Sequence, residues 1–218
     1  MASRRKNAAV VVAHPDDETL WAGGTILRGR DFSWTVVTVC RGGDPDRAPR
    51  FYRAMERLGA AGAMADLDDG PEQKLLDVGL IEGTVSSLLP RKNYDLLMTH
   101  SPFGEYTRHR RHEETGRTVA GLWEKARLAA SELWLFAYED GGKQYYPRPI
   151  GRAHLHTTLE EDVWEQKSDI IRNTYGFQPD SWETRSTPRT EAFWCFNDVR
   201  AYRNWLKKEE DFLGGNAK

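Results

Sequence analysis

The chain has 218 residues, of which 39% are hydrophobic and 29% charged, and its formal net charge is −2. This length is enough to bury a real core within one domain, and the near-neutral charge argues against a general nucleic-acid or membrane-surface binder. Two cysteines, Cys40 and Cys195, predict no disulfide framework and favour a reducing compartment.

The first predicted element is a strand at 8–13, an unbroken apolar run of the kind that forms buried parallel strands. This apolar run is too short for a signal peptide, and no stretch approaches a membrane span, so we expect a soluble, cytoplasmic protein. The motif AHPDDE at 13–18 then opens a helix that continues over 19–27, because proline and carboxylates suit a first helical turn. A histidine and three carboxylates thus gather at the carboxyl end of a central strand, where open α/β sheets bind ligands. A divalent metal is the simplest reason to collect such groups there.

Strands and helices continue to alternate over about 140 residues, which predicts parallel βαβ units. Further strands are expected at 34–40, 63–67, 94–99 and 133–138, and helices at 48–59, 78–89 and 115–130. The fold class is therefore α/β, with a Rossmann-like, mostly parallel sheet flanked by helices. We expect one domain over 1–218, with a core at about 8–140. A C-terminal extension at about 141–218, with an alternating piece at 153–157 and helices at 160–175 and 199–213, is expected to pack near the site.

A second cluster, RHRRHEE at 108–114, follows the loop after the strand at 94–99. In parallel topology this loop lies on the same sheet edge as His14, and a spacing of three residues places His109 and His112 on one face of a helical turn. A catalytic zinc takes three such ligands and activates water, while a nearby carboxylate and histidine handle protons and developing charge. The two clusters contain all of these groups.

Together these motifs resemble the LmbE-like, or PIG-L, family of zinc-dependent N-deacetylases, which act on N-acetylglucosamine conjugates and related amino sugars. The similarity rests on AHPDDE (13–18), TVVTVCRGG (35–43), THSPFGEYTRH (99–109), HxxH (109–112) and EAFW (191–194). The first motif, placed after an apolar strand, is specific, whereas HxxH alone is weak.

The resemblance implies one Zn²⁺ per chain and assigns three zinc ligands: His14, Asp17 and His112. It also implies that Asp16 is the general base and that His109 is the electrophilic or acid histidine near the scissile amide. Arg47 lies where the family often has a substrate-contacting arginine.

The expected function is therefore removal of an N-acetyl group from an amino-sugar conjugate by metal-activated water. One alternative is an amidase on the same scaffold that acts on a larger acyl amide, such as a thiol–sugar conjugate or a glycopeptide. Another is a non-catalytic, metal-retaining sugar-binding module. Arg110 and Arg111 replace the Pro-Asp pair common in the family, which predicts an anionic substrate. Nucleic acid is not an expected partner, and assembly into a homo-oligomer stays open.

Less specific interpretations stay open for the remaining histidines. His109 and His112, taken alone, fit a solvated basic face. His100 is as compatible with a structural role at a strand end as with a functional one. His154 and His156 alternate as on a strand, which favours a structural or surface role. Many relatives carry a further C-terminal histidine, whereas this chain reads YGFQ at 175–178, so their substrates do not transfer directly.

Overall fold

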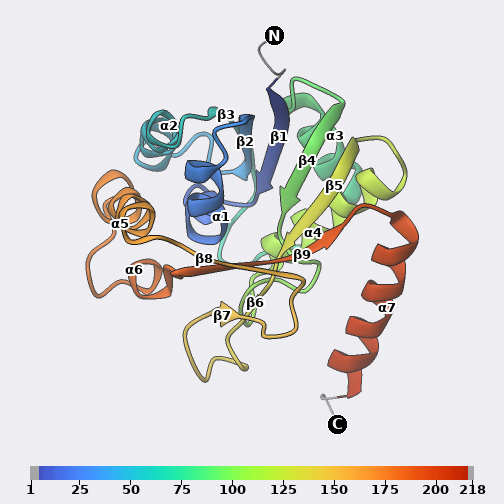
Figure 1. Ribbon diagram of the computed structural model, residues 1–218. Coiled ribbons are helices and arrows are strands. Elements are labelled where there is room, and N and C mark those ends of the chain that lie inside the picture. The colour runs from blue at the N-terminus through green and yellow to red at the C-terminus, as the bar shows by residue number, and fades with distance from the viewer. Residues whose placement is uncertain (1–4, 216–218) are drawn as a thin grey trace.

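The structure, a computed structural model, describes residues 5–215. The main sheet contains seven strands: β1 (Lys6–Val12), β2 (Phe32–Cys40), β3 (Ala61–Leu67), β4 (Asn93–Thr99), β5 (Ala129–Phe136), β8 (Leu155–Thr158) and β9 (Thr190–Phe196). Their spatial order is β3-β2-β1-β4-β5-β9-β8 (Figure 1). The first five in this order pair in parallel, and β9 and β8 are antiparallel additions. This arrangement confirms the predicted α/β fold with a mostly parallel sheet.

Helices cover both faces of the sheet (Figure 1). They are α1 (Asp17–Arg28), α2 (Arg47–Leu58), α3 (Val78–Leu88), α4 (Arg110–Glu124), α5 (Glu161–Asp169), the π-helical turn η1 (Ile170–Thr174), α6 (Trp182–Ser186) and α7 (Val199–Gly215). A small hairpin of β6 (Tyr138–Glu139) and β7 (Arg148–Pro149) stands beside the sheet. Among the described helices, none has both the length and the apolar character needed to cross a membrane.

The sequence of β1 explains why it lies at the centre. Its alternate residues enter two hydrophobic clusters, one on each side of the sheet. Ala9 and Val11 pack with side chains of α3 and α4, whereas Val10 and Val12 pack with side chains of α1 and α2. A strand buried on both faces must be apolar at every position, which is the pattern that predicted it.

The structure corrects some predicted boundaries. Helix α4 begins at Arg110 rather than at 115, because His109 is its extended N-cap residue, and it ends at Glu124. Strand β5 accordingly begins at Ala129 rather than at 133. Strand β9 was not predicted as an element, although its EAFW segment was noted as a motif. Gly59 adopts φ 67° and ends α2, as its position after the helix pattern predicted.

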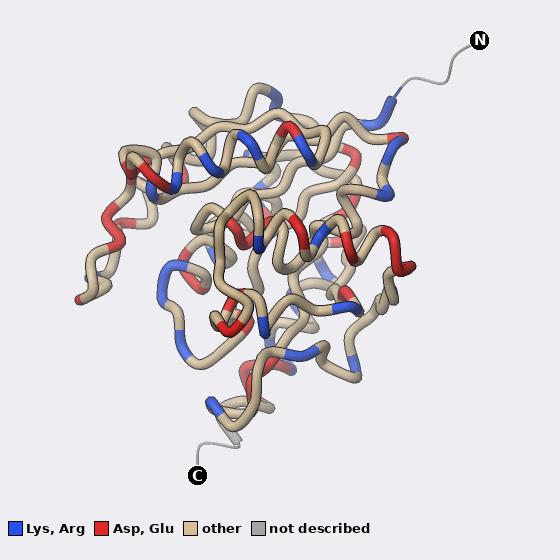
Figure 2. The backbone as a smooth tube through the Cα atoms, turned by 90° about the vertical axis from the view of Figure 1, so that its left-hand side faces the viewer, with Lys and Arg blue, Asp and Glu red and all other residues tan. Residues whose placement is uncertain are grey.

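Charged residues are mixed along the chain. Figure 2 shows basic and acidic positions interspersed on the helices that face the viewer, and neither sign fills this face. This distribution agrees with the small net charge.

Candidate active site

The loop after β1 places three polar side chains at the carboxyl edge of the sheet. Asp16 is the N-cap residue of α1, and Asp17 is its first helical residue. The carboxylate Oδ2 of Asp17 turns back and accepts a hydrogen bond of 3.0 Å from the backbone N–H of His14. Helix α4 approaches the same edge from the loop after β4 and contributes His112, which is fully buried.

Three donor atoms meet at this point in a nearly equilateral arrangement, here called the donor triangle: His14 Nδ1, Asp17 Oδ2 and His112 Nε2. The distances are 3.2 Å from His14 Nδ1 to Asp17 Oδ2, 3.2 Å from His112 Nε2 to Asp17 Oδ2, and 3.3 Å between the two nitrogens. In a tetrahedral zinc site with bonds near 2.0–2.1 Å, two ligand atoms lie about 3.3 Å apart. Two imidazole nitrogens and one carboxylate oxygen are also ligand types that zinc accepts. The residues present therefore fit a zinc ion bound by three protein ligands.

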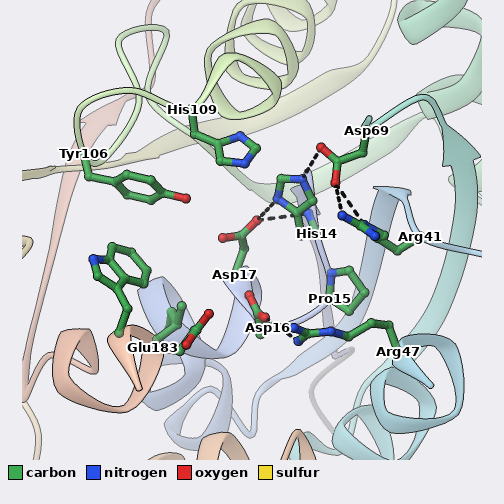
Figure 3. Close-up of a pocket in the computed structure, with 12 residues that line it drawn as sticks. His14, Pro15, Asp16, Asp17, Arg41, Arg47, Asp69, Tyr106, His109 and Glu183 are labelled. Atoms are coloured by element: carbon green, nitrogen blue, oxygen red, sulfur yellow. Dashed lines mark hydrogen bonds and ion pairs between the residues drawn. The ribbon is translucent and has the colours of Figure 1, made fainter. Parts of the chain in front are cut away.

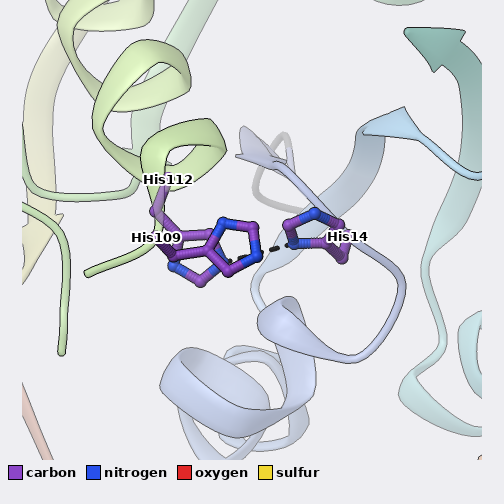
Figure 4. A group of neighbouring side chains, drawn as sticks. All are labelled: His14, His109 and His112. Carbon is purple, nitrogen blue, oxygen red and sulfur yellow. Dashed lines mark hydrogen bonds between the residues drawn. The ribbon is translucent and has the colours of Figure 1, made fainter. Parts of the chain in front are cut away.

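His109 stands beside the donor triangle. Its ring centroid lies 4.6 Å from the centroids of both His14 and His112 (Figure 4). His14, His109 and His112 could also hold a metal, and so could Asp17, His100 and His112. The two groups overlap with the donor triangle, so this edge of the sheet is where metal-binding side chains concentrate.

The remaining nitrogen of each triangle histidine faces a carboxylate. His112 Nδ1 lies 2.7 Å from Glu105 Oε2. His14 Nε2 lies 3.1 Å from Asp69 Oδ1, although not in hydrogen-bonding alignment. Metal-binding histidines commonly have such carboxylate partners, which fix the ring orientation and raise the basicity of the ligating nitrogen. Neither Glu105 nor Asp69 was singled out from the sequence.

His100 connects this arrangement to the end of β1. Its Nε2 accepts the backbone N–H of Ala13 at 2.9 Å, so the proton of a neutral ring is on Nδ1. Nδ1 in turn lies 2.9 Å from Glu105 Oε2, the same oxygen that faces His112. His100 therefore links the end of β1 to Glu105, which favours a structural role.

The pKa values of the two neighbouring aspartates, Asp16 and Asp17, are shifted in opposite directions. Burial opposes the charge on Asp17, but the pKa of this carboxyl is held well below its usual range, mainly by His112. Burial and the adjacent Asp17 raise the pKa of Asp16 well above its usual range, although Arg47 acts against them. Two carboxyl groups whose pKa values are driven apart suit different roles, one as a ligand and one as a base.

Asp16 occupies an unusual backbone conformation, with φ 109° and ψ −32°. Its backbone N–H donates to Glu18 Oε2 at 3.1 Å, and Glu18 Oε1 accepts the hydroxyl of Tyr175 at 2.7 Å. Glu18 is fully buried, and Tyr175 belongs to the extension after residue 140. The extension thus helps to hold the turn that carries Asp16.

Two further side chains surround the donor triangle. Burial and the nearby His112 and His14 lower the pKa of His109 to about 3, so its ring is neutral at neutral pH. Gln73 Nε2 lies 3.1 Å from His109 Nε2. The hydroxyl of Tyr106 points into the space between His109 and Asp17 (Figure 3), and burial raises its pKa, so it remains a hydrogen-bond donor.

His109 and Tyr106 line a pocket of about 280 Å³ together with His14, Asp16 and Asp17, here called the catalytic pocket (Figure 3). Arg47 lines this pocket, with Nη1 3.1 Å from Asp16 Oδ2 and the guanidinium 4.7 Å from the ring centroid of Phe177. Trp182 and Glu183 of α6 close the other side, so the extension supplies part of the wall, as expected. Five of the six residues selected from the sequence line this pocket, and the sixth, His112, lies behind it in the donor triangle.

The two arginines between His109 and His112 do not face the catalytic pocket. Arg111 is 1% exposed and donates to the backbone carbonyls of Asp68 and Lys74. Arg110 donates to the carbonyl of Gln73 at 2.6 Å. Both secure the loop that precedes α3, so the argument for an anionic substrate from these two side chains loses its basis.

The other histidines and Cys195 do not line the catalytic pocket, whereas the sulfur of Cys40 lies within 4.8 Å of ligand atoms of His14 and Asp69. His154 and His156 lie near the sheet edge and bond to backbone groups of Cys195 and Ile150, which agrees with the structural or surface role favoured from the sequence. Cys40 is buried and Cys195 is half-buried, and both are free thiols.

Comparison with protein families gives one match. Residues 9–123 match the PIG-L family, described as GlcNAc-PI de-N-acetylase. The chain belongs to the PIG-L family. The matched segment contains His14, Asp16, Asp17, His109 and His112, so all the residues of both clusters lie within it. A search of curated proteins found no match.

Solved structures confirm the fold of this PIG-L member. N,N′-diacetylchitobiose deacetylase from Pyrococcus horikoshii aligns with a TM-score of 0.64 and 17% identity over 88% of this chain and 84% of that one. A deacetylase of teicoplanin biosynthesis aligns at 0.62 and 14% identity, over 88% and 98%. The 4-carboxy-2-hydroxymuconate hydratase GalB from Pseudomonas putida aligns at 0.61 and 16%, over 87% and 95%. At these identities the likeness concerns the fold alone.

Proposed function

We propose that this protein is a zinc-dependent hydrolase that removes the N-acetyl group of an amino-sugar conjugate. The observation that carries the proposal is the donor triangle, whose spacing fits zinc and which lies beside a separate carboxyl group, Asp16, in the same pocket. Membership of a family described as a de-N-acetylase supports the reaction class.

His14, Asp17 and His112 would hold the metal. Zinc bound there supplies a Lewis acid, which polarises a carbonyl and lowers the pKa of water. Glu105 orients His112, Asp69 places a carboxylate beside His14, and the low pKa of Asp17 keeps this ligand charged. One zinc per chain follows from three ligands that converge on a single point.

Asp16 is the proposed general base. It is not one of the three triangle residues, it lines the catalytic pocket, and its raised pKa improves its strength as a proton acceptor. Arg47 stabilises its charged form and keeps the carboxylate oriented through the 3.1 Å contact. We further propose that Arg47 contacts the substrate, since its guanidinium also lines the pocket.

His109 and Tyr106 are the proposed donors to the acyl oxygen. A neutral imidazole and a phenol can each donate a hydrogen bond where negative charge develops on the tetrahedral carbon's oxygen. The pKa of about 3 for His109 favours the electrophilic role over that of a charged acid. The side-chain amide of Gln73 contacts the His109 ring and helps to hold it in place.

The extension after residue 140 is proposed to be part of the same catalytic domain. Tyr175 bonds Glu18, and Glu191 accepts the backbone N–H groups of Gly24 and Thr25 in α1. Residues 1–4 and 216–218 of the proposed domain lie outside the described residues. We propose a cytoplasmic location, in keeping with two free thiols.

The decisive experiment combines elemental analysis with an acetate-release assay on N-acetylglucosamine conjugates. The wild type should contain about one zinc per chain and release acetate. His112→Ala should lose both, whereas Asp16→Asn should keep zinc and lose turnover. His154→Ala, which removes an exposed histidine far from the pocket, is the matched control.

Each other outcome has a clear meaning. If the protein binds zinc but releases no acetate from any amino sugar, a panel of larger acyl amides would be tested next. Cleavage of one of them would favour the amidase, and cleavage of none would favour a metal-retaining binding module. Unchanged zinc content in His112→Ala would reject the donor triangle as the metal site. Full activity in Asp16→Asn would reject the base assignment.

A further inference from the structure

The carboxylate of Asp17 is held at both of its oxygens. Oδ2 belongs to the donor triangle and accepts the backbone N–H of His14 at 3.0 Å. Oδ1 accepts the indole N–H of Trp21, with 3.3 Å between Nε1 and Oδ1. Asp17 and Trp21 are four residues apart in α1, so their side chains lie on the same face of the helix. Asp17 thus presents Oδ2 to the donor triangle, while Trp21 binds Oδ1.

The indole of Trp21 is fixed by its surroundings. Trp21 is fully buried and Asp17 is 3% exposed, so solvent does not compete for their hydrogen bond. The indole packs against the ring of Tyr138, at 4.8 Å between centroids, and the Tyr138 hydroxyl donates to the backbone carbonyl of Trp21 at 3.3 Å. The same hydroxyl accepts the backbone N–H of Ala192 in β9 at 3.2 Å. Packing therefore sets the position of the indole N–H without help from a metal.

This hydrogen bond matters more to Asp17 than to Trp21. A buried indole N–H does not need a carboxylate in this fold, because the buried Nε1 atoms of Trp164 and Trp205 have no hydrogen-bond partner among residues 5–215. Within the same residues, Asp17 Oδ1 accepts a hydrogen bond from Trp21 alone. A buried carboxylate oxygen without a partner costs free energy, so loss of the indole N–H would release the Asp17 side chain from its present orientation.

We propose that Trp21 is a positioning residue for the metal site, whose indole N–H holds Asp17 so that Oδ2 alone is available to the zinc. This inference rests on the proposed function in taking zinc as the ion that the donor triangle binds. A carboxylate can ligate a metal through one oxygen or through both. A second oxygen from Asp17 would occupy the position that a catalytic zinc leaves open for water or substrate. By engaging Oδ1, Trp21 keeps that position free and fixes the ligand that remains.

Zinc affinity is the first measurement, made by competition with a chromophoric chelator. Trp21→Phe removes the N–H and keeps an aromatic ring, and it should bind zinc about 10- to 100-fold more weakly, the usual effect of losing the partner of a metal ligand. Trp34→Phe is the matched control. Trp34 is 5% exposed and its indole donates to the backbone carbonyl of Gly29 at 2.9 Å, so this variant loses a buried hydrogen bond that does not involve the site. Its zinc affinity should equal that of the wild type.

The second measurement uses the wild type, so it does not depend on whether a variant folds. Each of the eight tryptophans carries one indole N–H, which gives one signal in a proton–nitrogen correlation spectrum. Once Asp17 shares its charge with zinc, its Oδ1 becomes a weaker acceptor. The Trp21 signal should therefore move when zinc is added to the metal-free protein, whereas the Trp34 signal should stay in place. A tryptophan that only fills the core would not respond in this way.

The outcomes separate this proposal from the proposed function. Equal zinc affinities of Trp21→Phe and Trp34→Phe would overturn the role of Trp21 and leave the deacetylase standing, and so would a Trp21 signal that zinc does not move. Zinc binding that depends on Trp21, without acetate release by the wild type, would sustain the role of Trp21 and reject the deacetylase. A wild type that binds no zinc would reject both.

Discussion

The guanidinium of Arg47 lies 3.1 Å from the carboxylate of Asp16, and both side chains line the catalytic pocket. Burial and Asp17 raise the pKa of Asp16, and Arg47 is the main group that lowers it. Burial and Asp17 therefore favour the protonated form of Asp16, whereas Arg47 favours the charged form that acts as a base.

Arg47→Ala should shift the pH dependence of the enzyme. Without the guanidinium, the pKa of Asp16 rises further, so the base becomes protonated at a higher pH and the acidic limb of the kcat/KM profile moves upward. Arg47→Lys should move it less, because a positive charge remains. The measurement is a pH–rate profile, and Arg53→Ala, an exposed arginine on the same helix, is the control. An acidic limb that stays in place in Arg47→Ala would argue that Asp16 is not the titrating base.

Glu105→Gln should weaken zinc binding. The carboxylate of Glu105 faces both His112 and His100, so an uncharged amide removes the partner that orients the ligand. Loss of such a partner typically lowers metal affinity about 10- to 100-fold. Competition with a chromophoric chelator would measure the affinity. Glu132→Gln changes an exposed glutamate and should leave it unaltered, and equal affinities in the two variants would contradict the role of Glu105.

The buried ion pair of Lys167 and Glu191 should dominate the stability of the extension. Glu191 accepts the backbone N–H groups of Gly24 and Thr25, at 2.7 Å each, and Lys167 Nζ at 2.8 Å. Glu191→Ala leaves a buried ammonium with only the carbonyl of Pro188, which should cost about 3–5 kcal/mol.

Lys167→Met should cost less, because Glu191 keeps its donors from α1. Urea unfolding would rank the two variants. Glu161→Ala, which breaks an exposed pair with Arg189, should leave the midpoint almost unchanged. A larger loss from Lys167→Met than from Glu191→Ala would show that the lysine, rather than the glutamate, organises this contact.

Neither thiol should react in the folded protein near neutral pH. Burial raises the pKa of both Cys40 and Cys195 to about 12. A raised pKa keeps the thiol protonated until the pH exceeds that value, and only the thiolate is nucleophilic. Alkylation followed by mass spectrometry at pH 8 should find both cysteines unmodified, and both modified in urea. Rapid native labelling of Cys40 would show that the end of β2 opens.

The sequence predicted the centre of the fold better than its edge. The apolar runs of β1, β2 and β4 indicate buried strands, because a strand covered on both faces is mostly apolar. Strand β9 was missed since its polar Glu191 and its aromatic residues give no clear period, and its pairing with β5 depends on a distant contact. The start of α4 was misplaced because the charged run before 115 carries no hydrophobic pattern.

The residues of the site also differ in how well the sequence predicts them. His14, Asp17 and His112 could be found because they belong to compact motifs at strand ends. Glu105, Asp69 and Trp182 are single residues whose role depends on loops that fold back from elsewhere, so no local pattern marks them. An anionic substrate loses the support of Arg111 for a related reason: the sequence shows that Arg111 is charged but not that its side chain is buried.

The strained backbone of Asp16 would affect how this protein responds to selection for thermal stability. A non-glycine residue at φ 109° has a strained backbone, and the carboxyl group of Asp16 is buried beside that of Asp17. Both features reduce the free energy of unfolding. Asp16→Gly should relieve both burdens and yield a more heat-resistant protein without activity. A screen for thermal tolerance alone would therefore enrich inactive variants. Directed evolution of this protein for stability should also select for catalytic activity in every round of screening.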